Sequence, residues 1–176
     1  CEINYLKEDL LVPFQEPENL KYSPDPRGLL GARESVCRYY AEKEIRVTPD
    51  QVFLTASTSE AYSFIFRLMM ESKEELLVPR PSYPLFDYLC SLNDITPRSY
   101  SLVYEGRWKL DTGGIGALFG AQTRGLIVVN PNNPTGNFVK ENEKNALNAL
   151  CGKSDRFIIS DEVFFDFAFR AGDRIS

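Results

Sequence analysis

Short runs of apolar residues alternate with segments of helical period along most of this chain. Residues 76–78, 125–129 and 157–159 have the continuous apolar character of buried strands, and we also predict a short buried strand at residues 52–54. Parallel strands need long crossover connections, which are usually helices. The alternation therefore predicts a three-layer α/β/α fold with a mainly parallel central sheet.

The segments between these runs carry apolar side chains three and four residues apart. On this basis we predict helices at residues 28–44, 61–68, 85–92 and 143–150. The glycine-rich stretch 113–120 does not fit a nucleotide-binding motif, because its last glycine falls one residue late. We interpret it as a helix that begins at Asp111 or Thr112.

Composition excludes several function classes. The chain has no histidine, which removes Ser-His and Cys-His nucleophile systems and the usual histidine metal sites, so no metal is expected. The net charge of -5 and the scattered Lys and Arg residues argue against a nucleic-acid partner. No apolar run has the ~20 residues of a membrane helix, and no leader pattern follows Cys1, so we predict a cytoplasmic protein without a membrane partner. The four cysteines form no CxxC pair and are expected to be buried or incidental thiols.

Polar side chains follow the ends of the predicted strands. Ser57, Tyr83, Asn133 and Asp161 each stand just beyond a different apolar run. Because ligands of such sheets bind beyond the carboxyl ends of the strands, we expect these segments to converge on one edge.

Residues 130–136 read NPNNPTG and follow a predicted buried strand. An ordinary Pro/Asn/Gly turn is one interpretation. The segment also closely resembles the NPNNPTG motif of the class I/II aminotransferases, enzymes of the type I pyridoxal-phosphate fold. The resemblance implies that the cofactor is pyridoxal 5'-phosphate and that Asn133 donates a hydrogen bond to its ring hydroxyl oxygen.

Residues 160–164 read SDEVF and resemble the S-D-E-x-Y segment of the same family. This implies that Asp161 pairs with the pyridine nitrogen and keeps it protonated, which makes the ring an electron acceptor. It also implies that Val163 packs against the face of the ring. Phe164 stands where the family usually has a tyrosine, and it lacks that hydroxyl. Without the resemblance, an Asp after a strand is more often a helix cap.

Two further segments resemble cofactor-binding parts of the family. Residues 54–61 resemble the turn that holds the cofactor phosphate, which assigns Ser57, Thr58 and Ser59 to that group at a helix N-terminus. An ordinary Ser/Thr cap is the alternative interpretation. Residues 81–84 resemble the P-x-Y-P segment, in which the ring of Tyr83 would stack on the pyridine.

Upstream, Tyr22, Gly28 and Arg33 resemble the Y…G…LR signature, although Ala32 replaces the usual leucine. In relatives this tyrosine reaches the phosphate across a dimer interface. The resemblance therefore implies a homodimer in which Tyr22 is contributed in trans.

The resemblance implies that the protein transfers an amino group between an amino acid and a 2-oxo acid. It assigns residues 1–27 to an N-terminal segment and residues 28–176 to an incomplete large domain, with the small C-terminal domain absent. The lysine that forms the Schiff base is expected beyond the chain, since no lysine here stands in an S-x-S-K context; the lysines are Lys7, Lys21, Lys43, Lys73, Lys109, Lys140, Lys144 and Lys153.

Two alternatives stay open at this stage. An amino-acid decarboxylase or lyase of the same fold would use the same electron sink. An aminotransferase-like effector domain of a transcription regulator would keep the fold without the reaction. The sequence does not identify the substrate.

Overall fold

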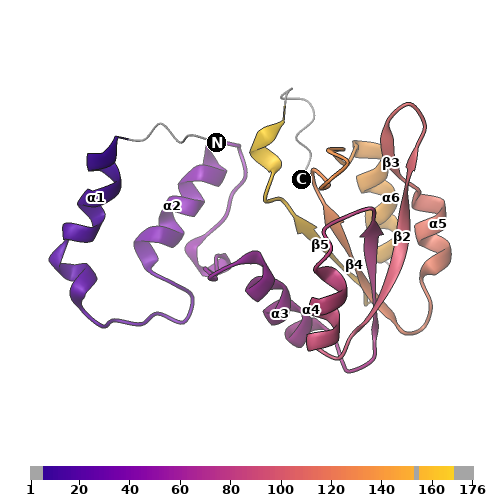
Figure 1. The fold of residues 1–176 in the computed structure, drawn as a ribbon, viewed down its shortest axis with the longest axis horizontal. Helices are drawn as coiled ribbons and strands as arrows, with labels where there is room; N and C mark the ends of the chain where they lie inside the picture. Colours follow the sequence, from indigo (N-terminus) through magenta and orange to yellow (C-terminus); the bar gives the residue numbers. More distant parts are fainter. Residues whose placement is uncertain (1–5, 153–154, 169–176) are drawn as a thin grey trace. The chain divides into compact units, whose positions relative to one another are not determined.

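The computed structural model describes residues 6–152 and 155–168, and the chain forms two compact units, Cys1–Ser57 and Thr58–Ser176 (Figure 1). The predictions that concern Cys1, Lys153 and the chain after residue 168 lie outside the described residues. Within the described ranges, no helix has the length and apolar character needed to cross a bilayer.

The first unit is helical and is organised around the buried side chain of Arg33. Its Nε donates to the carbonyl oxygen of Gly28 at 2.9 Å, and one Nη donates to the carbonyl oxygen of Pro49 at 2.7 Å. The other Nη forms an ion pair with Asp25 at 3.2 Å. One guanidinium therefore joins two backbone carbonyls and one carboxylate. The elements of this unit are α1 (Lys7–Gln15), η1 (Pro17–Leu20), α2 (Leu30–Ala41) and η2 (Pro49–Gln51).

The strand predicted at residues 52–54 is wrong. The backbone N–H of Leu54 donates to the carbonyl oxygen of Arg27 at 2.9 Å, and no strand is assigned to these residues. Gly28 makes this approach possible, since its φ is +91° and a Cβ atom there would lie 2.7 Å from the Cβ of Leu54. Val52 is buried, but Phe53 is 65% exposed. Residues 52–54 thus bury the Val52 side chain, and their backbone pairs with the loop at Arg27.

The second unit is built on a five-stranded sheet in the order β3-β2-β1-β4-β5. The β1 strand pairs in parallel with β2 and β4, and β4 pairs in parallel with β5. The β2–β3 pair is antiparallel. The carboxyl ends of β1, β4 and β5 therefore meet at one edge of the sheet. The strands are β1 (Glu75–Arg80), β2 (Thr96–Tyr104), β3 (Trp108–Leu110), β4 (Thr123–Val129) and β5 (Phe157–Asp161).

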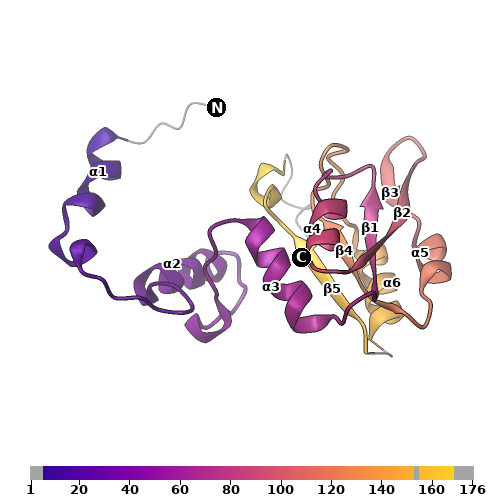
Figure 2. The same cartoon turned by 60° about the horizontal axis from the view of Figure 1, so that its bottom comes forward.

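Helices cover both faces of this sheet, as Figures 1 and 2 show. The α3 (Thr58–Met69) and α4 (Phe86–Leu92) helices pack on one face, and α5 (Thr112–Leu118) and α6 (Glu141–Cys151) pack on the other. Along β4 the side chains alternate between the two cores, as the period of a strand requires. Ile127 and Val129 face the first pair of helices, whereas Leu126 and Val128 face the second. The predicted three-layer, mainly parallel fold is confirmed.

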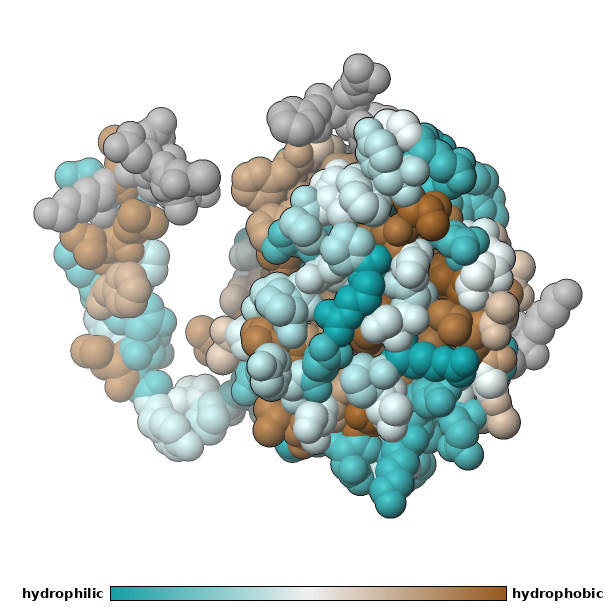
Figure 3. Space-filling view, turned by 45° about the vertical axis from the view of Figure 1, so that its right-hand side comes forward, coloured by the Kyte–Doolittle hydropathy of each residue, from teal (hydrophilic) through white to brown (hydrophobic). Residues whose placement is uncertain are grey.

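One face of the second unit agrees with this layering. On the face in Figure 3, hydrophilic and neutral residues predominate and hydrophobic residues form only small, separated spots. The apolar side chains of the strands and of the inner helix faces lie in the two cores instead.

Candidate functional site

Asp161 ends β5 and is held by donors on both carboxylate oxygens. Its Oδ1 accepts from the backbone N–H of Val163 at 3.1 Å, and its Oδ2 accepts from the hydroxyl of Tyr62 at 2.6 Å. The backbone N–H of Asn130 donates to the Asp161 carbonyl at 2.8 Å. The side chain is half-buried. Asp161 thus presents its carboxylate in one fixed orientation at the end of its strand.

Tyr62 was not among the predicted site residues. It lies one turn into α3 and is only 4% exposed. Its ring packs edge-on against Phe86, with centroids 5.5 Å apart. Burial and the adjacent Asp161 carboxylate raise the pKa of Tyr62, so its hydroxyl remains a donor at neutral pH. The one sequence signal is a tyrosine on the apolar face of a helix, because a buried tyrosine hydroxyl usually has a polar partner.

Tyr83 follows β1 and is 37% exposed. Its ring lies edge-on to Phe86 at a centroid distance of 6.1 Å and an interplanar angle of 81°. Because Phe86 also contacts Tyr62, a row of three rings leads from the exposed Tyr83 to Asp161. The structure therefore brings Tyr83 and Asp161 to the same side of the sheet.

The loop at 130–136 is built around Asn132, which is buried and was not predicted to matter. Its side-chain amide donates to the carbonyl oxygen of Pro81 at 2.9 Å and to the hydroxyl of Thr135 at 2.7 Å, and its Oδ1 accepts from Ser82 at 2.9 Å. Gly136 closes the turn with φ of +70°, a conformation that favours glycine. These bonds tie the loop after β4 to the loop after β1.

Asn133 follows this anchor and is exposed, and its amide is accessible to a ligand. Val163 and Phe164 are also accessible, at 55% and 42% exposed. Phe164 packs edge-on against Phe167, with centroids 6.0 Å apart. The predicted residues after β4 and β5 thus stand at the rim of the sheet edge, outside both cores.

The predicted phosphate residues divide between the units. Thr58 and Ser59 form the first turn of α3, where backbone N–H groups lack helical partners and suit an anion. Ser57 precedes them as the last residue of the first unit, and its carbonyl oxygen accepts from the Thr55 hydroxyl at 3.0 Å. Tyr22 belongs to the first unit and is 95% exposed.

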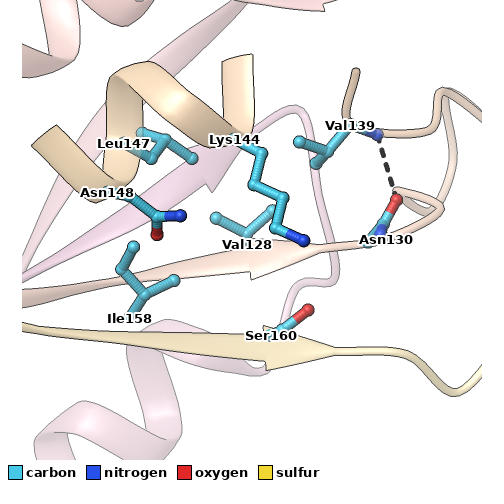
Figure 4. A pocket seen from close by; sticks show the side chains of 8 residues that line it. All are labelled: Val128, Asn130, Val139, Lys144, Leu147, Asn148, Ile158 and Ser160. Atoms are coloured by element: carbon cyan, nitrogen blue, oxygen red, sulfur yellow. Dashed lines mark hydrogen bonds between the residues drawn. The ribbon is translucent and has the colours of Figure 1, made fainter. Parts of the chain in front are cut away.

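A cavity of about 240 Å³ lies between α6 and the strands β4 and β5 (Figure 4). Val128, Leu147 and Ile158 give it an apolar wall, and Lys144 and Ser160 lie on its more polar side. None of the predicted site residues lines it. It lies on the face of the sheet opposite Tyr62, because Val128 belongs to the other core, so we assign it no role in the site.

Residues 5–176 match the family described as aminotransferase class I and II. The chain belongs to this family. Its members use pyridoxal phosphate, so the predicted family and cofactor are confirmed.

Relatives within the family are named for different activities. S-alkyl-thiohydroximate lyase SUR1 of Arabidopsis thaliana is 30% identical over 159 residues, which is 89% of this chain and 34% of that protein. Tyrosine aminotransferase of Caenorhabditis elegans is 31% identical over 144 residues, which is 81% of this chain and 31% of that protein. The chain thus spans about a third of the length of these relatives.

Solved structures agree on the fold. Alanine aminotransferase from Pyrococcus furiosus superposes with a TM-score of 0.83 at 30% identity, over 96% of this chain and 42% of that one. The aromatic aminotransferase from Pyrococcus horikoshii gives the same TM-score at 22% identity, over 90% of this chain and 43% of that one. The second likeness bears on the fold alone.

Proposed function

We propose that this chain supplies the cofactor-holding side of an enzyme that transfers an amino group between an amino acid and a 2-oxo acid. The observation that carries the proposal is the position of Asp161, whose two carboxylate oxygens are oriented by Tyr62 and the Val163 N–H. A fixed carboxylate beyond the end of a parallel strand suits the ring nitrogen of pyridoxal phosphate. When bound, that group supplies an electron sink for the substrate carbanion.

The remaining predicted residues fit the other parts of the cofactor. Thr58 precedes Tyr62 by four residues, which is ~6 Å along the helix axis, and Tyr62 contacts Asp161. An anion at the start of α3 would therefore lie within one small molecule's length of the carboxylate. We assign Ser57, Thr58 and Ser59 to the phosphate, and the exposed Tyr83 ring to one face of the pyridine.

In this arrangement each residue performs one task. Asp161 holds a proton on the ring nitrogen, and Asn133 donates to the ring hydroxyl oxygen. Phe164 has no hydroxyl, so among the residues assigned here Asn133 alone serves that oxygen. Val163 contacts the ring from its apolar side. The enzyme would be a homodimer in which Tyr22 of each protomer reaches the site of the other. It would act in the cytoplasm.

A lyase is the second candidate function. It is favoured by the 30% identity to the Arabidopsis lyase, which is similar to that of the tyrosine aminotransferase. Both reactions need the same electron sink, so Asp161 serves either one. The two differ in whether a 2-oxo acid acceptor is consumed.

The test is an assay of the protein in its full natural length with an amino donor and a 2-oxo acid acceptor. Asp161→Ala should lower the rate by more than about tenfold, because an unprotonated pyridine is a poor electron sink. Asp155→Ala is the matched control, since it removes an exposed carboxylate of the same unit that pairs with Arg124. Undiminished turnover in Asp161→Ala would overturn the proposal. Release of product without consumption of the acceptor would favour the lyase.

A further inference from the structure

We propose that Tyr62 is a positioning residue for the cofactor: its hydroxyl holds the Asp161 carboxylate in the rotamer that the pyridine nitrogen requires. The inference rests on the proposed function and extends it to a residue outside the recognised motifs. Tyr62 occupies Oδ2 of Asp161 from within the protein.

The geometry is that of a charge-assisted hydrogen bond. The distance from the Tyr62 hydroxyl to Oδ2 is 2.6 Å, which falls in the short range typical of O–H donors to carboxylates. The residues are 99 positions apart in the chain, so the tertiary fold creates this contact. Such a bond fixes the position of Oδ2 more firmly than a bond between neutral groups would, because charge-assisted hydrogen bonds are the stronger ones.

Packing fixes the donor. Tyr62 lies in the core between Phe66, at a centroid distance of 5.8 Å, and Phe86, at 5.5 Å. Both rings are fully buried. A tyrosine held in this way keeps its hydroxyl at one point above the end of β5. Because Val163 donates to Oδ1, the carboxylate cannot rotate without breaking one bond or the other.

The consequence concerns the proton shared between Asp161 and the ring nitrogen. A carboxylate that Tyr62 and the Val163 N–H hold in one orientation offers the nitrogen an acceptor at a fixed position. Removal of the Tyr62 hydroxyl would give the Asp161 carboxylate more rotational freedom. This freedom weakens the part of cofactor binding that depends on the nitrogen.

The experiment measures the contribution of the ring nitrogen to cofactor binding in the full-length protein. Calorimetry compares pyridoxamine phosphate, which has no aldehyde to react with lysines, with an analogue in which CH replaces the ring nitrogen. The ratio used is the dissociation constant of the carbon analogue divided by that of pyridoxamine phosphate, and it measures the contribution of the ring nitrogen. Tyr62→Phe should reduce this ratio about fivefold, corresponding to the net worth of one hydrogen bond.

Tyr100→Phe is the matched control. It removes another buried tyrosine hydroxyl, which donates to the Ile127 carbonyl oxygen at 2.8 Å in the other core. This control should leave the ratio unchanged. If Tyr62→Phe weakens both ligands equally, Tyr62 is structural and the inference fails. If Asp161→Asn also leaves the ratio unchanged, the pairing of Asp161 with the nitrogen fails, and the proposed function fails with it.

A second measurement needs no variant. The hydroxyl proton of Tyr62 should shift in the NMR spectrum of the wild-type protein when pyridoxamine phosphate binds, since Asp161 then shares its charge with the ring. The carbon analogue should leave that resonance in place. Equal shifts with both ligands would contradict a link through the nitrogen.

Discussion

A Cβ atom on Gly125 would lie 2.7 Å from the carbonyl oxygen of Phe157, so β4 and β5 approach each other too closely at this point for any larger residue. Gly125 and Phe157 are register partners, and Phe157 is the first residue of β5. Asp161 is four residues further along β5. The spacing of the two strands, and hence the placement of the carboxylate, depends on this absence of a side chain.

Gly125→Ala should therefore destabilise the protein by about 1–3 kcal/mol, since the new methyl group would clash with both the backbone and the ring of Phe157. Urea unfolding followed by circular dichroism measures the change. Gly113→Ala in α5 is the control, because its Cβ would meet only Asp111 Oδ1 at an ordinary 3.6 Å. That variant should be neutral or slightly stabilising. Equal stability of Gly125→Ala and the wild type would contradict the predicted clash.

Asn132 and Asn133 are neighbours with opposite expected effects. Asn132→Ala should lower the free energy of unfolding by about 2–3 kcal/mol, because it removes three partly buried side-chain hydrogen bonds. Asn133→Ala should change stability by less than about 0.5 kcal/mol, since the residue is exposed. It should instead weaken binding of pyridoxamine phosphate. Unfolding curves and calorimetry on both variants separate the two roles, and a reversed pattern would refute the assignment of Asn133.

Stability should fall at alkaline pH through Cys90. Burial, with a smaller contribution from Asp87, raises the pKa of this thiol from 9.0 to about 12. The unfolded chain therefore loses the thiol proton first, so stability is full below pH 9 and declines as the pH rises toward 12, by at most about 1.4 kcal/mol per pH unit.

Cys90→Ala should flatten this decline between pH 9 and 11, although its smaller side chain lowers stability at every pH. Leu89→Ala on the same helix supplies the comparison, because it also truncates a core residue but carries no titratable group. It should retain the wild-type slope. A Cys90→Ala slope equal to that of the wild type would show that the thiol does not titrate differently in the two states.

The lysine prediction can be tested on the 176-residue chain. Incubation with pyridoxal phosphate, borohydride reduction and peptide mapping should give scattered, partial adducts on several lysines and no transamination. The reason is that a Schiff-base lysine must be positioned to act as nucleophile and base, and no lysine here stands in the family's segment. A single stoichiometric adduct together with activity would identify a catalytic lysine within the chain.

Periodicity predicted most of the second unit. The helices at α3, α4 and α6 and the strands β1, β4 and β5 all coincide with predicted segments. The β2 strand was missed because it contains Pro97 and Arg98 and buries only Tyr100 and Leu102, so it has no apolar run. The helix predicted at 113–120 is α5, and Asp111 caps it by accepting from the Gly114 N–H at 3.0 Å.

The sequence predicted only part of the candidate site. Asp161, Asn133 and Tyr83 stand in recognisable motifs that follow strands. Tyr62 and Asn132 do not differ in the sequence from a packed tyrosine and a turn residue. Their roles follow from contacts with residues 99 and 50 positions away, which no local pattern encodes.

The alternation of side chains along β4 also has an evolutionary consequence. Neighbouring residues of one strand belong to different cores, and Tyr62 packs in only one of them. Substitutions in the layer formed by α5 and α6 can accumulate without altering the row of three rings that leads to Asp161. Substitutions at Ile127 or Val129 would affect that row of rings, because these residues belong to the same core. Sequence drift in this fold should therefore be uneven, with the layer remote from Asp161 diverging faster.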